Sequence, residues 1–308
     1  MSHERRSPLL TIVLAALAVA CAREPRSDSP DTALAPAATA LMDAPDQSFT
    51  RGAVTINYRT LGTGAPVLLV HGYGDNLAMW VGLADSLARD HRVFAIDTRG
   101  FGKSSKPGDV TNYGKEMITD LVAFLDHVGV QQAHVIGYSM GAVLGATLAL
   151  EHPERVRTLT LAAGAFPRDS AAMRAMVTPW INDLEHGRRL TGLIKQVVPV
   201  LPDSTARTFS DQLFAEGDSA ALVAALKGFP ALSIDWTRAA GSKIPTVAIV
   251  GVDDPLRPYS QDLAARWPGA KLVELPETDH MTLFTAPRLL EEVRLLTSTN
   301  PIDATQGR

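Results

Sequence analysis

The sequence has little cysteine and little excess charge, and both shortages exclude classes of protein. One cysteine in 308 residues means that no disulfide can form within the chain. The formal net charge is −4 and charged residues make up 20% of the chain, so no nucleic-acid partner is expected. None of the eight histidines stands at metal-ligand spacing from another, and we expect neither a metal nor a cofactor.

The apolar run near the N-terminus is too short to cross a membrane. Arg5 and Arg6 precede the run Leu9 to Ala20, which falls below the ~20 residues that a membrane-spanning helix needs. A basic segment, a short apolar run and small residues are typical of a secretory signal, cut near the end of the run. Its end also resembles a bacterial lipobox that finishes at Cys21, although Ala18 stands where leucine is usual. Because the single cysteine lies here, we favour a lipoprotein signal with Cys21 lipidated.

The segment after this 1–21 signal has the composition of a linker. Residues 22–47 are rich in alanine, proline, serine and aspartate and show no apolar periodicity. Such a segment cannot bury enough apolar surface to offset its ordering entropy, so a disordered tether is expected. At ~5–6 Å × √n it would hold the rest of the protein roughly 30 Å from an anchor. We expect the folded domain over residues 48–300 and a short tail at 301–308.

The stretch from Ala133 to Leu150 predicts a strand, a sharp turn and a helix. The turn reads Gly137-Tyr138-Ser139-Met140-Gly141, with a serine at its apex. The flanking glycines leave room for a strained backbone that pushes the Ser139 hydroxyl out of the sheet. The Met140 N–H lies at the helix N-terminus, where it is free to donate to a developing oxyanion.

This strand–turn–helix unit resembles the nucleophile elbow of the α/β-hydrolase superfamily. The similarity extends over roughly Phe49 to Leu296. A buried strand at 66–70 leads into His71-Gly72-Tyr73-Gly74, as in that superfamily. The resemblance implies a mostly parallel central sheet flanked by helices, with Ser139 as nucleophile and the N–H groups of Tyr73 and Met140 as oxyanion donors.

A serine nucleophile needs a base, and an imidazole base needs an acid that fixes its tautomer and stabilises its cation. In the superfamily the chain order is serine, acid, histidine. His280 is the only histidine after the strand expected at 245–251. We therefore expect His280 to be the base.

Several carboxylates compete for the role of the acid. Asp253 and Asp254 both follow the strand at 245–251, and the superfamily's usual position, three residues after the closing glycine, is Asp254. Asp169 is an outside candidate, because some members carry the acid after the preceding strand. Asp279, which lies beside the expected base, is interpreted as a loop-shaping residue.

Between residues 168 and 241 the alternation of strands and helices stops. Short helices broken by Pro179, Pro199 and Pro202 are expected there. An insertion at this place resembles the helical cap of many superfamily members. Such a cap would cover the active site with methionine, leucine, phenylalanine and tryptophan and give an apolar pocket.

A serine nucleophile indicates acyl transfer, whereas haloalkane dehalogenases and epoxide hydrolases of this superfamily attack with a carboxylate. We expect an esterase or lipase for small apolar acyl substrates, lipid-anchored in the cell envelope and facing the periplasm if the source has an outer membrane. Amidase, lactonase, carbon–carbon hydrolase and cofactor-free haloperoxidase activities use the same triad and stay open. So does a binding lipoprotein without turnover, because the fold alone does not fix the function.

Lipidation of Cys21 can be tested directly. The wild-type protein should fractionate with membranes, since two or more acyl chains give stable anchoring at ~0.8 kcal/mol per buried CH₂. Cys21→Ser should block lipid attachment and leave the protein soluble or as an uncut precursor. Mass spectrometry of the mature N-terminus decides between the two signals. An unmodified peptide that begins at or beyond position 21 would mean plain secretion.

Overall fold

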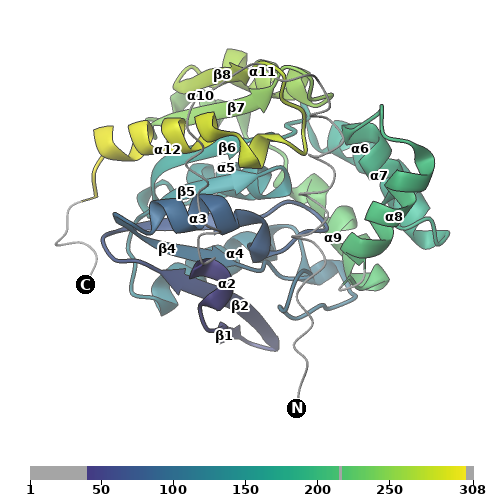
Figure 1. Ribbon diagram of the computed structural model, residues 1–308, viewed down its shortest axis with the longest axis horizontal. Coiled ribbons are helices and arrows are strands. Elements are labelled where there is room, and N and C mark those ends of the chain that lie inside the picture. The colour runs from purple at the N-terminus through teal and green to yellow at the C-terminus, as the bar shows by residue number, and fades with distance from the viewer. Residues whose placement is uncertain (1–39, 215–216, 303–308) are drawn as a thin grey trace, which may run out of the picture.

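An eight-stranded sheet forms the centre of the protein (Figure 1). The computed structural model describes residues 40–214 and 217–302. The strands are β1 (Gln47–Arg51), β2 (Val54–Leu61), β3 (Ala65–Val70), β4 (His91–Ile96), β5 (Ala133–Tyr138), β6 (Val156–Ala162), β7 (Thr246–Gly251) and β8 (Ala270–Leu275). Their order is β1-β2-β4-β3-β5-β6-β7-β8; β1–β2 and β2–β4 pair antiparallel and the other neighbours pair parallel. The predicted fold class is confirmed.

Residues 40–47, assigned to the disordered tether, belong to the ordered domain, and that part of the prediction is wrong. A short helix, α2 (Ala40–Asp43), buries Leu41 completely. The Leu41 N–H donates to Asp85 Oδ1 at 2.8 Å, and Arg59 Nη1 donates to the Leu41 carbonyl at 2.9 Å. Contacts with distant residues order this segment, so its own composition could not reveal them. The expected signal with Cys21, the tether up to residue 39 and the tail from residue 303 lie outside the described residues.

Helices cover both faces of the sheet, and alternate strand residues face each side. Along β3, Leu68 and Val70 pack on one face, and Val67 and Leu69 pack on the other, all with no exposed surface. The first face is covered by α4 (Lys115–His127), α5 (Met140–Glu151) and α11 (Arg257–Arg266), and the second by α3 (Val81–Leu87) and α12 (Pro287–Thr299). Figure 1 shows α3 and α12 in front of the sheet. Burial on both faces explains why the central strands read as continuous apolar runs.

A group of helices follows β6 and precedes β7, in the region where the sequence predicts an insertion. These cap helices are α6 (Ser170–Glu185), α7 (Thr191–Val197), α8 (Asp203–Leu213), α9 (Ser219–Gly228), η5 (Phe229–Leu232) and α10 (Trp236–Gly241). Figure 1 shows α6, α7 and α8 together beyond one end of the strands. No helix in residues 40–214 or 217–302 is long and apolar enough to span a membrane.

The turn between β5 and α5 has the strained conformation expected from its glycines. Ser139 has a backbone φ of 52°, in the left-handed region that residues other than glycine rarely adopt. Its N–H donates to the Ala162 carbonyl at 2.8 Å, which holds the turn against the end of β6. A Cβ on Gly141 would overlap the carbonyl oxygens of Val70 and His71, and a Cβ on Gly137 would overlap the backbone of Gly141. Only glycine therefore fits on either side of this turn.

We expect Gly141→Ala to destabilise the protein, because the added methyl overlaps backbone atoms that cannot move independently. The loss should be about 3 kcal/mol in the free energy of unfolding, measured by urea denaturation. Gly82→Ala is the matched control, because a Cβ on Gly82 in α3 would meet nothing within 4 Å. It should be neutral or stabilising by up to ~1 kcal/mol. Equal unfolding midpoints for the two variants would contradict the steric argument.

Candidate active site

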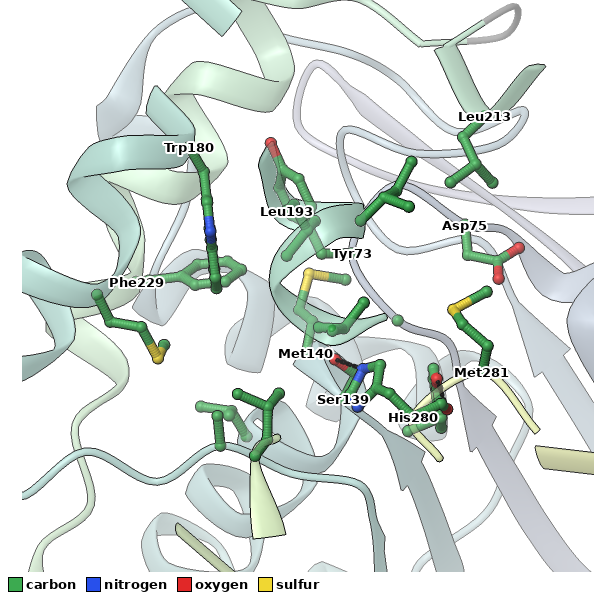
Figure 2. A pocket seen from close by; sticks show the side chains of 18 of the residues that line it. Tyr73, Asp75, Ser139, Met140, Trp180, Leu193, Leu213, Phe229, His280 and Met281 are labelled. Atoms are coloured by element: carbon green, nitrogen blue, oxygen red, sulfur yellow. Dashed lines mark hydrogen bonds between the residues drawn. The ribbon is translucent and has the colours of Figure 1, made fainter. Parts of the chain in front are cut away.

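The turn after β5, the loop after β7 and the loop after β8 bring three polar side chains into one chain of hydrogen bonds, and Figure 2 shows two of them, Ser139 and His280. His280 Nε2 lies 3.2 Å from Ser139 Oγ, and His280 Nδ1 lies 2.9 Å from Asp254 Oδ2. Asp254 and His280 are 3% and 4% exposed, so water competes weakly for their hydrogen bond. This arrangement allows His280 to take the Ser139 proton while Asp254 stabilises the resulting cation.

Further hydrogen bonds hold the acid and the base in place. Asp254 Oδ1 accepts from the Leu256 N–H at 2.8 Å, so the oxygen that does not contact His280 also has a donor. The Asp253 N–H donates to the Thr278 carbonyl at 3.0 Å, which joins the loop after β7 to the loop after β8. Tyr138, next to Ser139, donates a hydrogen bond from its hydroxyl to the His280 carbonyl. Asp254 and His280 are thus each held by a further hydrogen bond besides the one between them.

The other candidate acids are either exposed to solvent or accept hydrogen bonds from backbone N–H groups. Asp253 is exposed, on the neighbouring position of the same loop. Asp169 caps α6 by accepting from the Ala172 N–H at 2.8 Å. Asp279 accepts from the N–H groups of Met281 and Thr282 at 3.0 and 2.8 Å, the loop-shaping contacts that the sequence suggests. Of these candidates, Asp254 is the one that contacts the imidazole.

The two expected oxyanion donors flank the serine. Met140 is the first residue of α5, and Tyr73 follows β3, the strand beside β5. Within the described residues neither backbone N–H donates a hydrogen bond, so both are available to a ligand. A Cβ on Gly72 would lie 2.9 Å from the Tyr138 ring, so the strand-end loop passes close to the elbow. The Tyr73 hydroxyl donates to the Leu222 carbonyl at 2.9 Å and ties this loop to cap helix α9.

A pocket opens over Ser139 between the sheet and the cap helices. Figure 2 shows its walls, which are mostly apolar. The apolar lining residues are Met140, Val143, Ala165, Met173, Met176, Trp180, Leu193, Ile194, Val197, Phe209, Leu213, Phe229, Leu256, Met281 and Phe284. Most of them come from the cap helices, as the sequence predicts for this segment.

Two polar residues of the site were missed by sequence reasoning. Tyr138 is one, because its hydrogen bond to the His280 carbonyl joins positions that are far apart in the chain. Asp75 is the other: its half-buried carboxyl group lines the pocket, and burial raises its pKa to about 7. The sequence could have indicated Asp75 through its position two residues after Tyr73, one of the expected oxyanion donors. In the described part of the chain, no group of three or more histidine, cysteine or carboxylate side chains is arranged to hold a metal.

Residues 65–287 match the model of the alpha/beta hydrolase fold family. The chain belongs to this family. The match runs from β3 to the first residue of α12 and includes the three loops that carry Ser139, Asp254 and His280.

Relatives in the family carry out different reactions. A 2-hydroxymuconate semialdehyde hydrolase from Pseudomonas putida is 30% identical over 258 residues, which cover 78% of this chain and 92% of the relative. A pimeloyl-[acyl-carrier protein] methyl ester esterase from Aeromonas hydrophila is 33% identical over 112 residues, 36% of this chain and 42% of the relative. The enol-lactonase structure from Burkholderia xenovorans superposes with a TM-score of 0.69 at 20% identity, covering 82% of this chain and all of that one. The family match and the two sequence relatives support a hydrolase, the solved structure supports the fold, and the substrate stays open.

We expect Asp254→Asn to lower kcat by ~10³–10⁴, because an amide can donate to His280 Nδ1 and select the wrong tautomer. The fold should survive, since the amide oxygen can still accept from the Leu256 N–H. Asp253→Asn is the matched control on the neighbouring exposed position and should change kcat by no more than about twofold. Turnover of a chromogenic substrate, with melting temperatures as a check on folding, gives the comparison. A large loss of kcat in Asp169→Asn and none in Asp254→Asn would contradict this assignment, because the acid would then follow β6 and not β7.

Proposed function

We propose that this hydrolase cleaves carboxylic esters of apolar acyl groups through an acyl-enzyme on Ser139. The observation that carries the proposal is the Ser139–His280–Asp254 chain of hydrogen bonds at the floor of an apolar pocket. A serine nucleophile adds to a carbonyl carbon, and the available N–H groups of Tyr73 and Met140 flank the place where the oxyanion would form.

The proposed reaction has two halves. Ser139 Oγ bonds to the carbonyl carbon while its proton passes to His280 Nε2, and Asp254 accepts a hydrogen bond from Nδ1–H. The tetrahedral intermediate collapses, the alcohol leaves with the proton from His280, and the acyl group stays on Ser139. Water then gives its proton to His280 and attacks the acyl carbon, and the acid leaves as Ser139 regains its proton. The cap residues contribute binding energy through apolar contact with the acyl chain.

The walls of the pocket favour an uncharged acyl group over an acid substrate of the kind that the muconate relative is named for. That relative is named for a carboxylate, and a carboxylate in an apolar pocket needs a paired cation. Among the described residues that line the pocket there is no lysine and no arginine. An uncharged acyl group meets no such cost. Burial of its apolar surface would favour binding by a free energy of roughly 25 cal/mol per Å² removed from water.

For location, we propose a lipid-anchored protein of the cell envelope. The basic residues before the Leu9–Ala20 run and the lone Cys21 support this proposal.

The nucleophile is tested with a fluorophosphonate probe. The wild type should be labelled at Ser139, and labelling should be lost in Ser139→Ala and His280→Ala. On a panel of 4-nitrophenyl esters each variant should lose about 10⁴–10⁶ in kcat, because the nucleophile and its base act as a unit. Ser298→Ala, a change of an exposed serine at the end of α12, serves as the control and should label like the wild type. Equal labelling of wild type and Ser139→Ala would refute the assignment, and labelling without ester turnover would refute the substrate class.

A further inference from the structure

Asp75 is the one carboxylate among the described residues that line the active-site pocket. Its Oδ1 accepts from the Asn76 N–H at 2.8 Å, and no partner within the described residues donates to Oδ2. The side chain is half-buried, so it keeps access to the pocket. No lysine or arginine of the described lining neutralises it. A carboxylate in this position gives an otherwise apolar pocket a negative end.

The position of Asp75 indicates which part of a substrate it meets. Figure 2 shows Asp75 with Met281 and Leu213 on one side of Ser139 and His280, whereas Trp180 and Phe229 lie on the other side. Met281 follows His280 in the chain, and His280 must reach the leaving alcohol to protonate it. The broad apolar end near Trp180 suits the acyl chain. The end with Asp75 is then left for the alcohol.

We propose that Asp75 is a specificity-determining residue that selects esters whose leaving alcohol carries an ammonium group, the chemistry of an amino alcohol. The inference rests on the proposed ester hydrolysis and goes further by naming the alcohol half of the substrate. A cation held near a carboxylate in a site of low polarity gains far more than the same pair in water. An anionic alcohol at the same end meets repulsion with no cation to offset it.

The charge on Asp75 sets the pH range of this selectivity. Burial raises its pKa to about 7; the Asn76 N–H lowers the pKa, and the charge of Asp97 at the end of β4 raises it further. The pKa of Tyr138 at the end of β5 is raised mainly by burial, and the negative charge of Asp75 is one of the smaller causes that raise it further. Tyr73 and His280 are the remaining titratable residues of the described pocket lining, and burial raises the pKa of the Tyr73 hydroxyl. Because Asp75 is charged above its pKa, the preference for a cation should be present above pH 7 and fade below it.

The test uses two alcohols of the same shape and different charge. Choline butyrate carries a trimethylammonium group, and 3,3-dimethylbutyl butyrate replaces its nitrogen with carbon. The ratio of kcat/KM for the choline ester to that for the carbon analogue at pH 8 should be about tenfold higher in the wild type than in Asp75→Asn, a comparison that cancels the greater intrinsic reactivity of the choline ester. Asparagine can still accept from the Asn76 N–H, which preserves the turn. Asp253→Asn, which removes an exposed carboxylate outside the pocket lining, should keep the wild-type ratio.

The pH dependence of the wild-type ratio is a second measurement that needs no variant. Both substrates depend equally on the ionisation of His280 in the free enzyme, so that dependence cancels in the ratio and leaves the titration of Asp75. A ratio at pH 8 that Asp75→Asn leaves unchanged would overturn the proposal.

A phosphonate version of the pair separates this inference from the proposed function. Methylphosphonate thioesters with thiocholine or 3,3-dimethylbutanethiol leaving groups transfer phosphorus to Ser139, while the thiol leaves with the proton from His280. The ratio of their inactivation rates in the wild type, divided by the same ratio in Asp75→Asn, cancels the better leaving ability of thiocholine and measures the same selectivity even if no carboxylic ester is turned over. A charge preference here without ester turnover would support the role of Asp75 and refute ester hydrolysis. Ester turnover without a charge preference would support ester hydrolysis and refute the role of Asp75.

Discussion

The buried hydrogen bond between His280 Nδ1 and Asp254 Oδ2 is the interaction on which the rest of the site depends. It joins two loops that leave neighbouring parallel strands at the same edge of the sheet, where such folds place their ligands. A carboxylate with almost no exposed surface needs full hydrogen bonding, and Asp254 receives it from His280 and from the Leu256 N–H. The sheet supplies a rigid base for these bonds, so the imidazole meets Ser139 without further adjustment.

The sheet and the cap contribute different parts of the site. The sheet carries the reacting groups on short loops, and the strained turn at Ser139 survives because β6 and the flanking glycines hold it. The cap helices supply most of the apolar wall. The two parts meet at Tyr73, whose hydroxyl donates to the Leu222 carbonyl of α9 while its backbone N–H stays available. The cap and the loop that carries Tyr73 are therefore joined by a direct hydrogen bond.

We propose two different roles for one short segment after β3. Tyr73 would contribute its backbone N–H, a group that any residue except proline could provide, whereas Asp75 would contribute its side-chain carboxylate. The family match covers the shared catalytic loops, and relatives within it carry out different reactions. Asp75 and the cap residues line the pocket without taking part in the His280–Asp254 hydrogen bond, so their side chains can shape substrate preference while that bond stays intact.

The sequence by itself determined the fold class, the elbow at Ser139 and the chain order of serine, acid and histidine, because strand burial, a glycine-flanked turn and chain order are local or sequential patterns. It could not choose firmly between Asp253 and Asp254, since adjacent residues differ only in where the loop points them. The tertiary structure decided that choice and ordered residues 40–47 through contacts with Arg59 and Asp85. It also decided that Asp75 faces the pocket. Each of these outcomes depends on residues far apart in the chain, and local patterns carry no information about such contacts.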